Sequence, residues 1–263
     1  MDQSQECRVW SDIDGCSKAK RQEVKLPFKL RKAEQQVDAL LARVMAEEPT
    51  LLLQFPRPVE DLLCCALDVS IERHSALSEQ LVGQVLDKKY SVETSLELPR
   101  RLAGYTYAKG PNAVVFLNTG FSAASQLFTI AHEAGHICVE HLPRLASAAQ
   151  GSLFGPMEVA TLAARDPPSH IFAGNEGAAE DPDLANLKLD HRAWLREVIA
   201  NAFAAELLAP AREMLNLGRD VSDDDGRVRE ASARFGLSTS AARIRLAELG
   251  LISDKNQAIM FVK

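Results

Sequence analysis

Two histidines and a glutamate in one short segment can bind a metal ion and move a proton. His132, Glu133 and His136 lie within residues 128–138. On a helix, residues four apart share a face, so both histidines can direct an imidazole nitrogen at one point. Two imidazoles suit a zinc ion, and the carboxylate of Glu133 can take a proton from a zinc-bound water. This HExxH spacing is typical of zinc peptidases.

The alternative explanation is an amphipathic helix whose two histidines are packed in a core. Random placement at this composition would give roughly 0.01 HExxH segments per chain. Apolar neighbours, including Leu127, Ile130 and Ile137, already give the helix a packing face. We therefore interpret His132 and His136 as metal ligands rather than as core residues.

A catalytic zinc site usually has three protein ligands and one open position, so a third ligand must come from elsewhere. Glu197 is an acidic residue on an otherwise apolar segment, where a metal would compensate the cost of its charge. Glu140 faces His136 and is a candidate to orient that imidazole, whereas His141 is rotated off the metal-facing stripe. Further candidates are Asp190 and His191.

Composition is that of an ordinary globular protein. The 263 residues are 46% hydrophobic and 25% charged, enough for one large domain with or without an appendage. The net charge of −6 argues against nucleic-acid binding over the whole surface. No signal peptide or long apolar stretch is recognisable, and the five cysteines show no disulfide framework, so we expect a cytoplasmic protein without a membrane segment.

Apolar periodicity predicts most of the elements that must position these residues. Pro58 is suited to the first position of a helix, and Ser122 or Ser125 can cap the HExxH helix. Residues 1–24 show no apolar period and predict a mobile tail. The remaining helices are predicted at residues 30–45, 58–67 and 190–209, and strands at 69–72, 81–86, 104–108 and 114–118.

The last two strands form a predicted hairpin that leads into the HExxH helix. An extended substrate could pair with such a sheet edge and be held across the metal, or the hairpin could only cover the core. Residues 146–186 lose periodicity, apart from a candidate short helix at 157–164. We interpret them as a lid near the active-site mouth or as a disordered insertion without a role.

Two blocks of the sequence together resemble the ImmA/IrrE family of zinc metallo-endopeptidases. The first is the HExxH block at residues 128–136, and the second is the Asn-x-Phe-Ala-Ala-Glu-Leu-Leu-x-Pro run that begins at Asn201, four residues after Glu197. The resemblance covers roughly residues 30–250. It implies metal binding by His132, His136 and Glu197 with Glu133 as the base, and cleavage of a helix-turn-helix repressor that controls stress-response or mobile-element genes.

The C-terminal segment is predicted to be helix, glycine-containing turn and helix, with Ser238 as cap of the second helix. It resembles a helix-turn-helix unit. Residues 226–250 contain five arginines and two glutamates, a local charge of +3 that could contact DNA phosphates. The alternative is a helical pair that docks onto the catalytic domain or a partner.

These observations predict an α+β fold: a mainly helical zincin-like metallopeptidase core with a small antiparallel sheet and a C-terminal helix-turn-helix-like segment. The expected divisions are a tail at 1–24, a peptidase domain at 25–212 and the C-terminal segment at 213–263. The expected activity is zinc-dependent peptide hydrolysis, although such ligands also serve manganese or iron. His170 or His191 could assist as a second electrophile. The alternative function is a non-catalytic repressor-binding or DNA-binding regulator with a structural or vestigial metal site.

Overall fold

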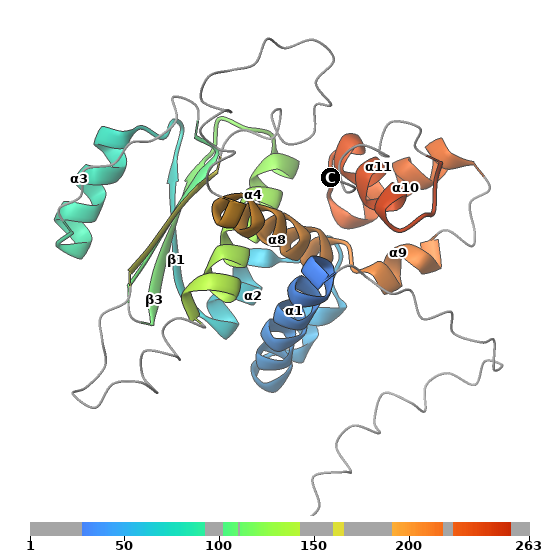
Figure 1. Ribbon diagram of the computed structural model, residues 1–263, viewed down its shortest axis with the longest axis horizontal. Helices are drawn as coiled ribbons and strands as arrows, with labels where there is room; N and C mark the ends of the chain where they lie inside the picture. Colours follow the sequence, from blue (N-terminus) through green and yellow to red (C-terminus); the bar gives the residue numbers. More distant parts are fainter. Residues whose placement is uncertain are drawn as a thin grey trace, which may run out of the picture.

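Helices and one sheet make up the computed structural model of the chain (Figure 1). The structure describes residues 28–92, 102–109, 111–142, 160–165, 191–217 and 223–253. The predicted tail at 1–24 lies outside these residues. In chain order the elements are α1 (Phe28–Glu47), the 3-10 helix η2 (Pro49–Leu53), α2 (Val59–Ala66), β1 (Asp68–His74), α3 (Glu79–Tyr90), β2 (Gly104–Lys109), β3 (Asn112–Asn118), α4 (Ala123–His136), the π-helical turn η3 (Ile137–His141), β4 (Ala160–Arg165), α8 (His191–Leu208), α9 (Ala211–Leu217), α10 (Asp224–Phe235) and α11 (Thr239–Glu248).

The sheet has four strands in the order β1-β3-β2-β4. The predicted hairpin is confirmed, since β2 and β3 pair antiparallel. The prediction of a purely antiparallel sheet is wrong, because β1 pairs with β3 in parallel. Helix α3 and strand β2 lie between β1 and β3 in the chain, which gives enough length for a parallel connection.

Helix α3 replaces the strand that was predicted at residues 81–86. The Ser78 hydroxyl accepts a hydrogen bond from the Leu81 amide and caps the helix. Val82 and Leu86, one helical turn apart, are fully buried against Tyr105 and the rest of one sheet face. The apolar run is therefore the inner face of a helix that covers the sheet (Figure 1).

Strand β4 falls where a short helix was predicted at 157–164. It pairs antiparallel with β2, and Thr106 lies opposite Ala163. Because β2 has partners on both sides, it is not a free edge of the sheet, whereas β4 is an edge strand that also contacts α4. The other residues of the predicted lid at 146–186 lie outside the described part of the chain.

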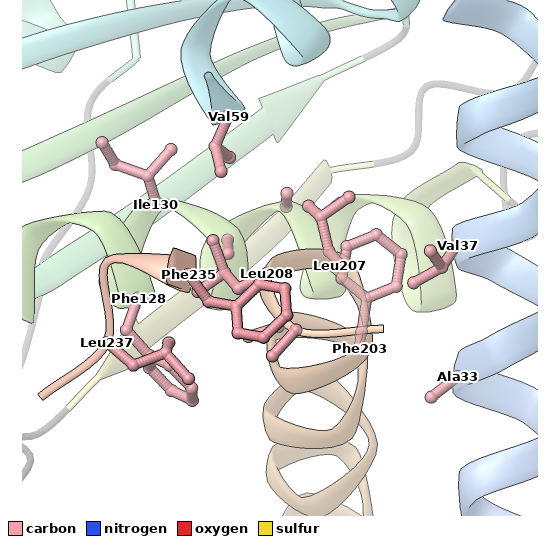
Figure 2. Packing of buried hydrophobic residues seen from close by; sticks show 14 of the residues in the cluster. Ala33, Val37, Val59, Phe128, Ile130, Phe203, Leu207, Leu208, Phe235 and Leu237 are labelled. Atoms are coloured by element: carbon pink, nitrogen blue, oxygen red, sulfur yellow. The ribbon is translucent and has the colours of Figure 1, made fainter. Parts of the chain in front are cut away.

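The main core lies between α4, α8 and α1 (Figure 2). Phe203, Leu207 and Leu208 of α8 are fully buried there. Full burial of such side chains contributes about 1.5–3 kcal/mol each, which holds α8 against α4. This packing fixes the helix that carries Glu197 beside the helix that carries both histidines.

The C-terminal helices α10 and α11 pack on this same core. Phe235 is fully buried and stands edge-on to Phe55, with 5.2 Å between ring centroids. Phe235 and Leu237 belong to the cluster that contains Phe128 of α4 (Figure 2). The two predicted C-terminal helices are present, and they pack on the core that contains the HExxH helix α4. The division at residue 212 stays a prediction.

None of the described helices combines the length and the apolar character that a membrane crossing requires.

Candidate metal centre

Helix α4 presents the two histidines. Ser122 is its N-cap and accepts a hydrogen bond from the Ser125 amide, so the first of the two predicted caps is the one used. His132 and His136 are buried, and their Nε2 atoms are 3.1 Å apart. The i, i+4 spacing therefore brings the two imidazoles to one point, as predicted.

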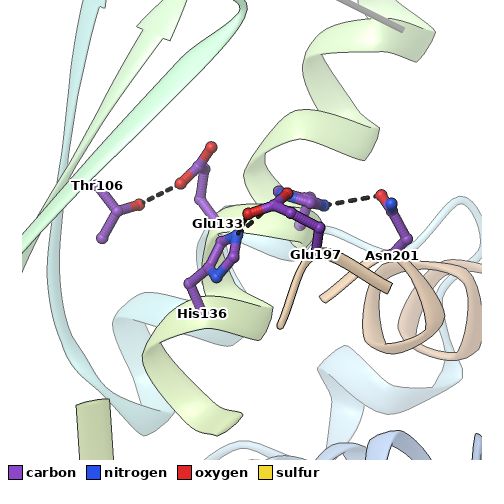
Figure 3. A network of polar contacts seen from close by, with 6 residues as sticks. Thr106, Glu133, His136, Glu197 and Asn201 are labelled. Atoms are coloured by element: carbon purple, nitrogen blue, oxygen red, sulfur yellow. Dashed lines mark hydrogen bonds and ion pairs between the residues drawn. The ribbon is translucent and has the colours of Figure 1, made fainter. Parts of the chain in front are cut away.

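Glu197 reaches this point from α8. Its Oε2 atom lies 3.3 Å from His132 Nε2, and its Oε1 atom lies 3.3 Å from His136 Nε2 (Figure 3). The side chain of Glu197 is 41% exposed, whereas the histidines are closed off from solvent. The opening to solvent thus lies on the Glu197 side of the three residues.

Close contact between α4 and α8 makes this approach possible. A β-carbon at Gly135 would lie 3.0 Å from the Ala200 α-carbon and 3.1 Å from the Ala200 carbonyl oxygen. Such distances are too short for an ordinary side chain, so the absence of one at position 135 sets the separation of the helices. Glu197 and Ala200 lie on the same part of α8, which brings the carboxylate within reach of the histidines.

The three residues fit a divalent metal by their spacing. Zinc–ligand bonds of about 2.0–2.1 Å in a tetrahedron place neighbouring ligand atoms roughly 3.3 Å apart. The ligand atoms of His132, His136 and Glu197 all lie within 4.8 Å of one another, with closest pairs at 3.1 and 3.3 Å. Among the described residues these two imidazoles and one carboxylate form a donor set that suits zinc.

Asn201 orients one imidazole. Its Oδ1 atom lies 2.9 Å from His132 Nδ1. Because an amide oxygen can only accept, Nδ1 is the donor, and Nε2 is the nitrogen that faces Glu197 and would bind a metal. Sequence reasoning noted Asn201 in the family-like run without giving it this role. Its spacing of four residues from Glu197 was the signal that could have shown it.

Charge also favours a cation here. Burial raises the pKa of the Glu197 carboxyl, but hydrogen bonds and charges from His132 and His136 outweigh it and hold the pKa well below its ordinary range. Glu197 is therefore ionised at neutral pH. The carboxylate itself has no proton to lose when a metal binds, whereas the imidazole hydrogens that face it would be displaced.

Glu133 lies beside the histidines on the side of the sheet. Its side chain is buried, and its Oε2 atom accepts a hydrogen bond of 2.6 Å from the Thr106 hydroxyl of β2 (Figure 3). Thr106 was not singled out by sequence reasoning. Threonine is common in strands, so its type gave no signal of a polar contact with a helix.

Of the other candidate residues, the structure describes the side chain of His141 alone. Among the described residues, the group that could hold a metal consists of His132, His136 and Glu197, and the buried His141 is not a member. The side chains of Glu140 and His191 lie outside the described part of the chain. The same holds for Asp190 and His170.

Comparison with known families matches one part of the chain. The family model of peptidase family M78, the IrrE N-terminal-like domain, matches residues 94–155. The matched segment contains His132, Glu133 and His136, and it ends before Glu197. The match supports a peptidase of the ImmA/IrrE family and confirms the resemblance seen in the sequence. No curated protein matches the chain.

Proposed function

We propose, from an IrrE N-terminal-like segment that contains the HExxH residues, that this chain is a zinc-dependent endopeptidase. The observation that carries the proposal is the convergence of His132, His136 and Glu197 from two helices, with Glu133 beside them. A structural zinc site has closed coordination and no use for a neighbouring carboxylate base. The position of Glu133 therefore favours hydrolysis over a purely structural role.

The chain's own residues divide the work of hydrolysis. His132, His136 and Glu197 hold the metal, which polarises a carbonyl and lowers the pKa of water when it is bound. Glu133 accepts a proton from the attacking water at a carboxylate oxygen and then delivers it to the leaving amine. Asn201 keeps His132 in the tautomer that offers Nε2 to the metal.

A protein substrate is part of the proposal, and the resemblance favours a helix-turn-helix repressor. An extended segment of such a substrate would pair with β4, which is the last strand of the sheet among the described residues and contacts α4. Backbone hydrogen bonds at that edge would hold the segment near the metal position. Cleavage of the repressor would release stress-response or mobile-element genes.

DNA binding by residues 226–250 receives less support. Four of the five arginines form ion pairs with acidic residues: Arg227 with Asp224, Arg234 with Glu213, Arg243 with Asp225, and Arg245 with Glu206. Pairing lowers the positive charge that is free for phosphates. We propose that these helices serve mainly as part of the protein core.

We also propose a cytoplasmic location. Cys64, Cys65 and Cys138 are free thiols in the described part of the chain. Thiols that stay unpaired are typical of a reducing compartment, where a transcriptional repressor would also be found.

The test compares wild type with Glu133→Gln, both loaded with zinc. Substrates are fluorescein-labelled casein as a general protein and a helix-turn-helix repressor that is co-expressed with this chain. Wild type should cleave the repressor, and the variant should bind zinc with the same stoichiometry but lose cleavage. If the variant still relieves repression as well as wild type does, the chain acts by binding, and the proposed hydrolysis is wrong.

A further inference from the structure

Strand β2 supplies one polar group to the face of the sheet that covers α4. Residues 104, 106 and 108 share this face because side chains alternate along a strand. Thr106 is 1% exposed, and its hydroxyl donates to Glu133 Oε2 at 2.6 Å. A buried hydroxyl without a hydrogen-bond partner would destabilise the fold. The contact with Glu133 supplies that partner for Thr106.

The hydrogen bond is short, since 2.6 Å lies below the distance of about 2.7–2.8 Å that is most common for a hydroxyl donor. Glu133 is itself fully buried, so water does not compete for the same oxygen atom. The carboxylate is therefore anchored to the sheet rather than free to turn on the helix.

Gly104 limits the same carboxylate from a second direction. A β-carbon at this position would lie 2.4 Å from Thr129 Cγ2 and 3.0 Å from Glu133 Oε1. Only glycine leaves room for the glutamate and for the neighbouring turn of α4. The two β2 positions thus act on different carboxylate oxygens. Thr106 donates a hydrogen bond to Oε2, and Gly104 leaves the room that Oε1 needs.

We propose that Thr106 is the residue that positions the Glu133 carboxylate for reaction, in a space that Gly104 keeps open. This inference rests on the proposed peptidase function. It adds a role for the sheet: β2 is the support that aims the base, and helix α4 supplies the base and two metal ligands. Thr106 acts through Glu133 and does not itself touch the substrate.

The experiment compares Thr106→Val, Thr106→Ser and the control Thr119→Val with wild type, all zinc-loaded. Valine keeps the shape of threonine and removes the hydroxyl, whereas serine keeps the hydroxyl. Thr119 also loses a side-chain hydrogen bond, to the His74 carbonyl oxygen at 3.1 Å, but lies in the turn after β3. Two properties are measured: the kinetics of cleavage of the same co-expressed repressor, and the position of the Glu133 carboxylate in crystals.

For Thr106→Val we expect kcat to fall about 10-fold or more with KM within about 2-fold, because the variant loses the contact that holds the carboxylate in place. The carboxylate should leave its wild-type position in the crystal. Thr106→Ser should restore both properties, and Thr119→Val should match wild type.

Two results would overturn the inference: an unchanged carboxylate position in Thr106→Val, or an unchanged kcat in a variant whose carboxylate has moved. If wild type cleaves nothing, the proposed function fails. The crystallographic comparison still decides whether Thr106 positions Glu133.

Discussion

Gly135 on α4 faces Ala200 on α8 with no room for a side chain between them, since a β-carbon at position 135 would lie 3.3 Å from the Ala200 β-carbon and closer still to its backbone. This contact sets how near Glu197 comes to His132 and His136. Residues at positions that look unimportant for chemistry can therefore control the metal centre by setting the distance between helices.

Gly135→Ala should push the two helices apart by a few tenths of an ångström. We expect a loss of about 1–3 kcal/mol in the free energy of unfolding, typical of overpacking, and weaker zinc binding. Urea unfolding and competition with a zinc chelator measure the two effects. Gly83→Ala is the matched control, because no atom lies within 4 Å of its new β-carbon. That change in α3 should stabilise by about 0.5–1 kcal/mol.

Glu197→Ala should remove one of three metal ligands. Zinc affinity should fall by more than the 10- to 100-fold that is typical when an outer-shell partner is lost. Removal of the metal with a chelator should lower the Tm of wild type and leave that of the variant nearly unchanged, because only wild type gains stability from binding. Exposed Glu230 on α10 gives the control, Glu230→Gln. Equal zinc affinity in wild type and Glu197→Ala would contradict the ligand assignment.

Asn201→Leu should weaken zinc binding by about 10- to 100-fold, since it removes the acceptor that fixes His132. Asn201→Asp keeps an acceptor oxygen and should retain most of the affinity. Isothermal titration with zinc distinguishes the two variants. A loss of equal size in both would mean that the amide NH2 group of Asn201 matters, and not the oxygen that faces His132.

Arg245 joins the C-terminal helices to α8. Its guanidinium is buried, pairs with Glu206 and donates to the Ala209 carbonyl oxygen at 3.1 Å. Arg245→Met should cost about 3 kcal/mol in the free energy of unfolding, because it removes the cation that pairs with both Glu206 and Glu248. Adding Glu206→Gln should recover part of this loss in a double-mutant cycle. Strictly additive losses would show that the pair is not coupled.

Glu248 gives the prediction for pH. Burial raises the pKa of its carboxyl, and the nearby Arg245 offsets this only in part. A carboxyl whose pKa is raised in the folded state favours folding at low pH, and that contribution is lost as pH rises through the raised value. Relative to wild type, Glu248→Gln should therefore become more stable as pH increases from about 4.5 to 7. Urea unfolding at several pH values measures this, and a flat difference would contradict it.

Much of the metal centre could be predicted because its signals are local. The spacing of His132 and His136 fixes a shared helix face, and Glu197 is conspicuous as a charge on an apolar helix. The hairpin was equally clear, with apolar strands on either side of a glycine and proline turn. The histidine pair and the hairpin each arise within one short segment, whereas the approach of Glu197 to the histidines depends on the packing of α8 against α4.

The remaining features depend on contacts between distant segments. Residues 81–86 have an apolar run that suits either a strand or the buried face of a helix. Packing against Tyr105 on the sheet stabilises the helix. Strand β4 forms because β2 offers it a partner, although its alanine-rich sequence favours a helix. The hydrogen bond between Thr106 and Glu133 forms only when the sheet lies over α4, and no local sequence pattern indicates that arrangement.

Strand β4 has a consequence for how the centre assembles. It lies in the long stretch of chain between His136 and Glu197, and its pairing with β2 divides that stretch into two shorter connections. Closing a loop costs entropy that grows with its length, so a docked β4 lowers the cost of bringing the carboxylate to the histidines. Pairing of residues 160–165 and capture of the ion are therefore linked equilibria, and a chain that loses this strand should bind its ion more weakly even with every ligand intact.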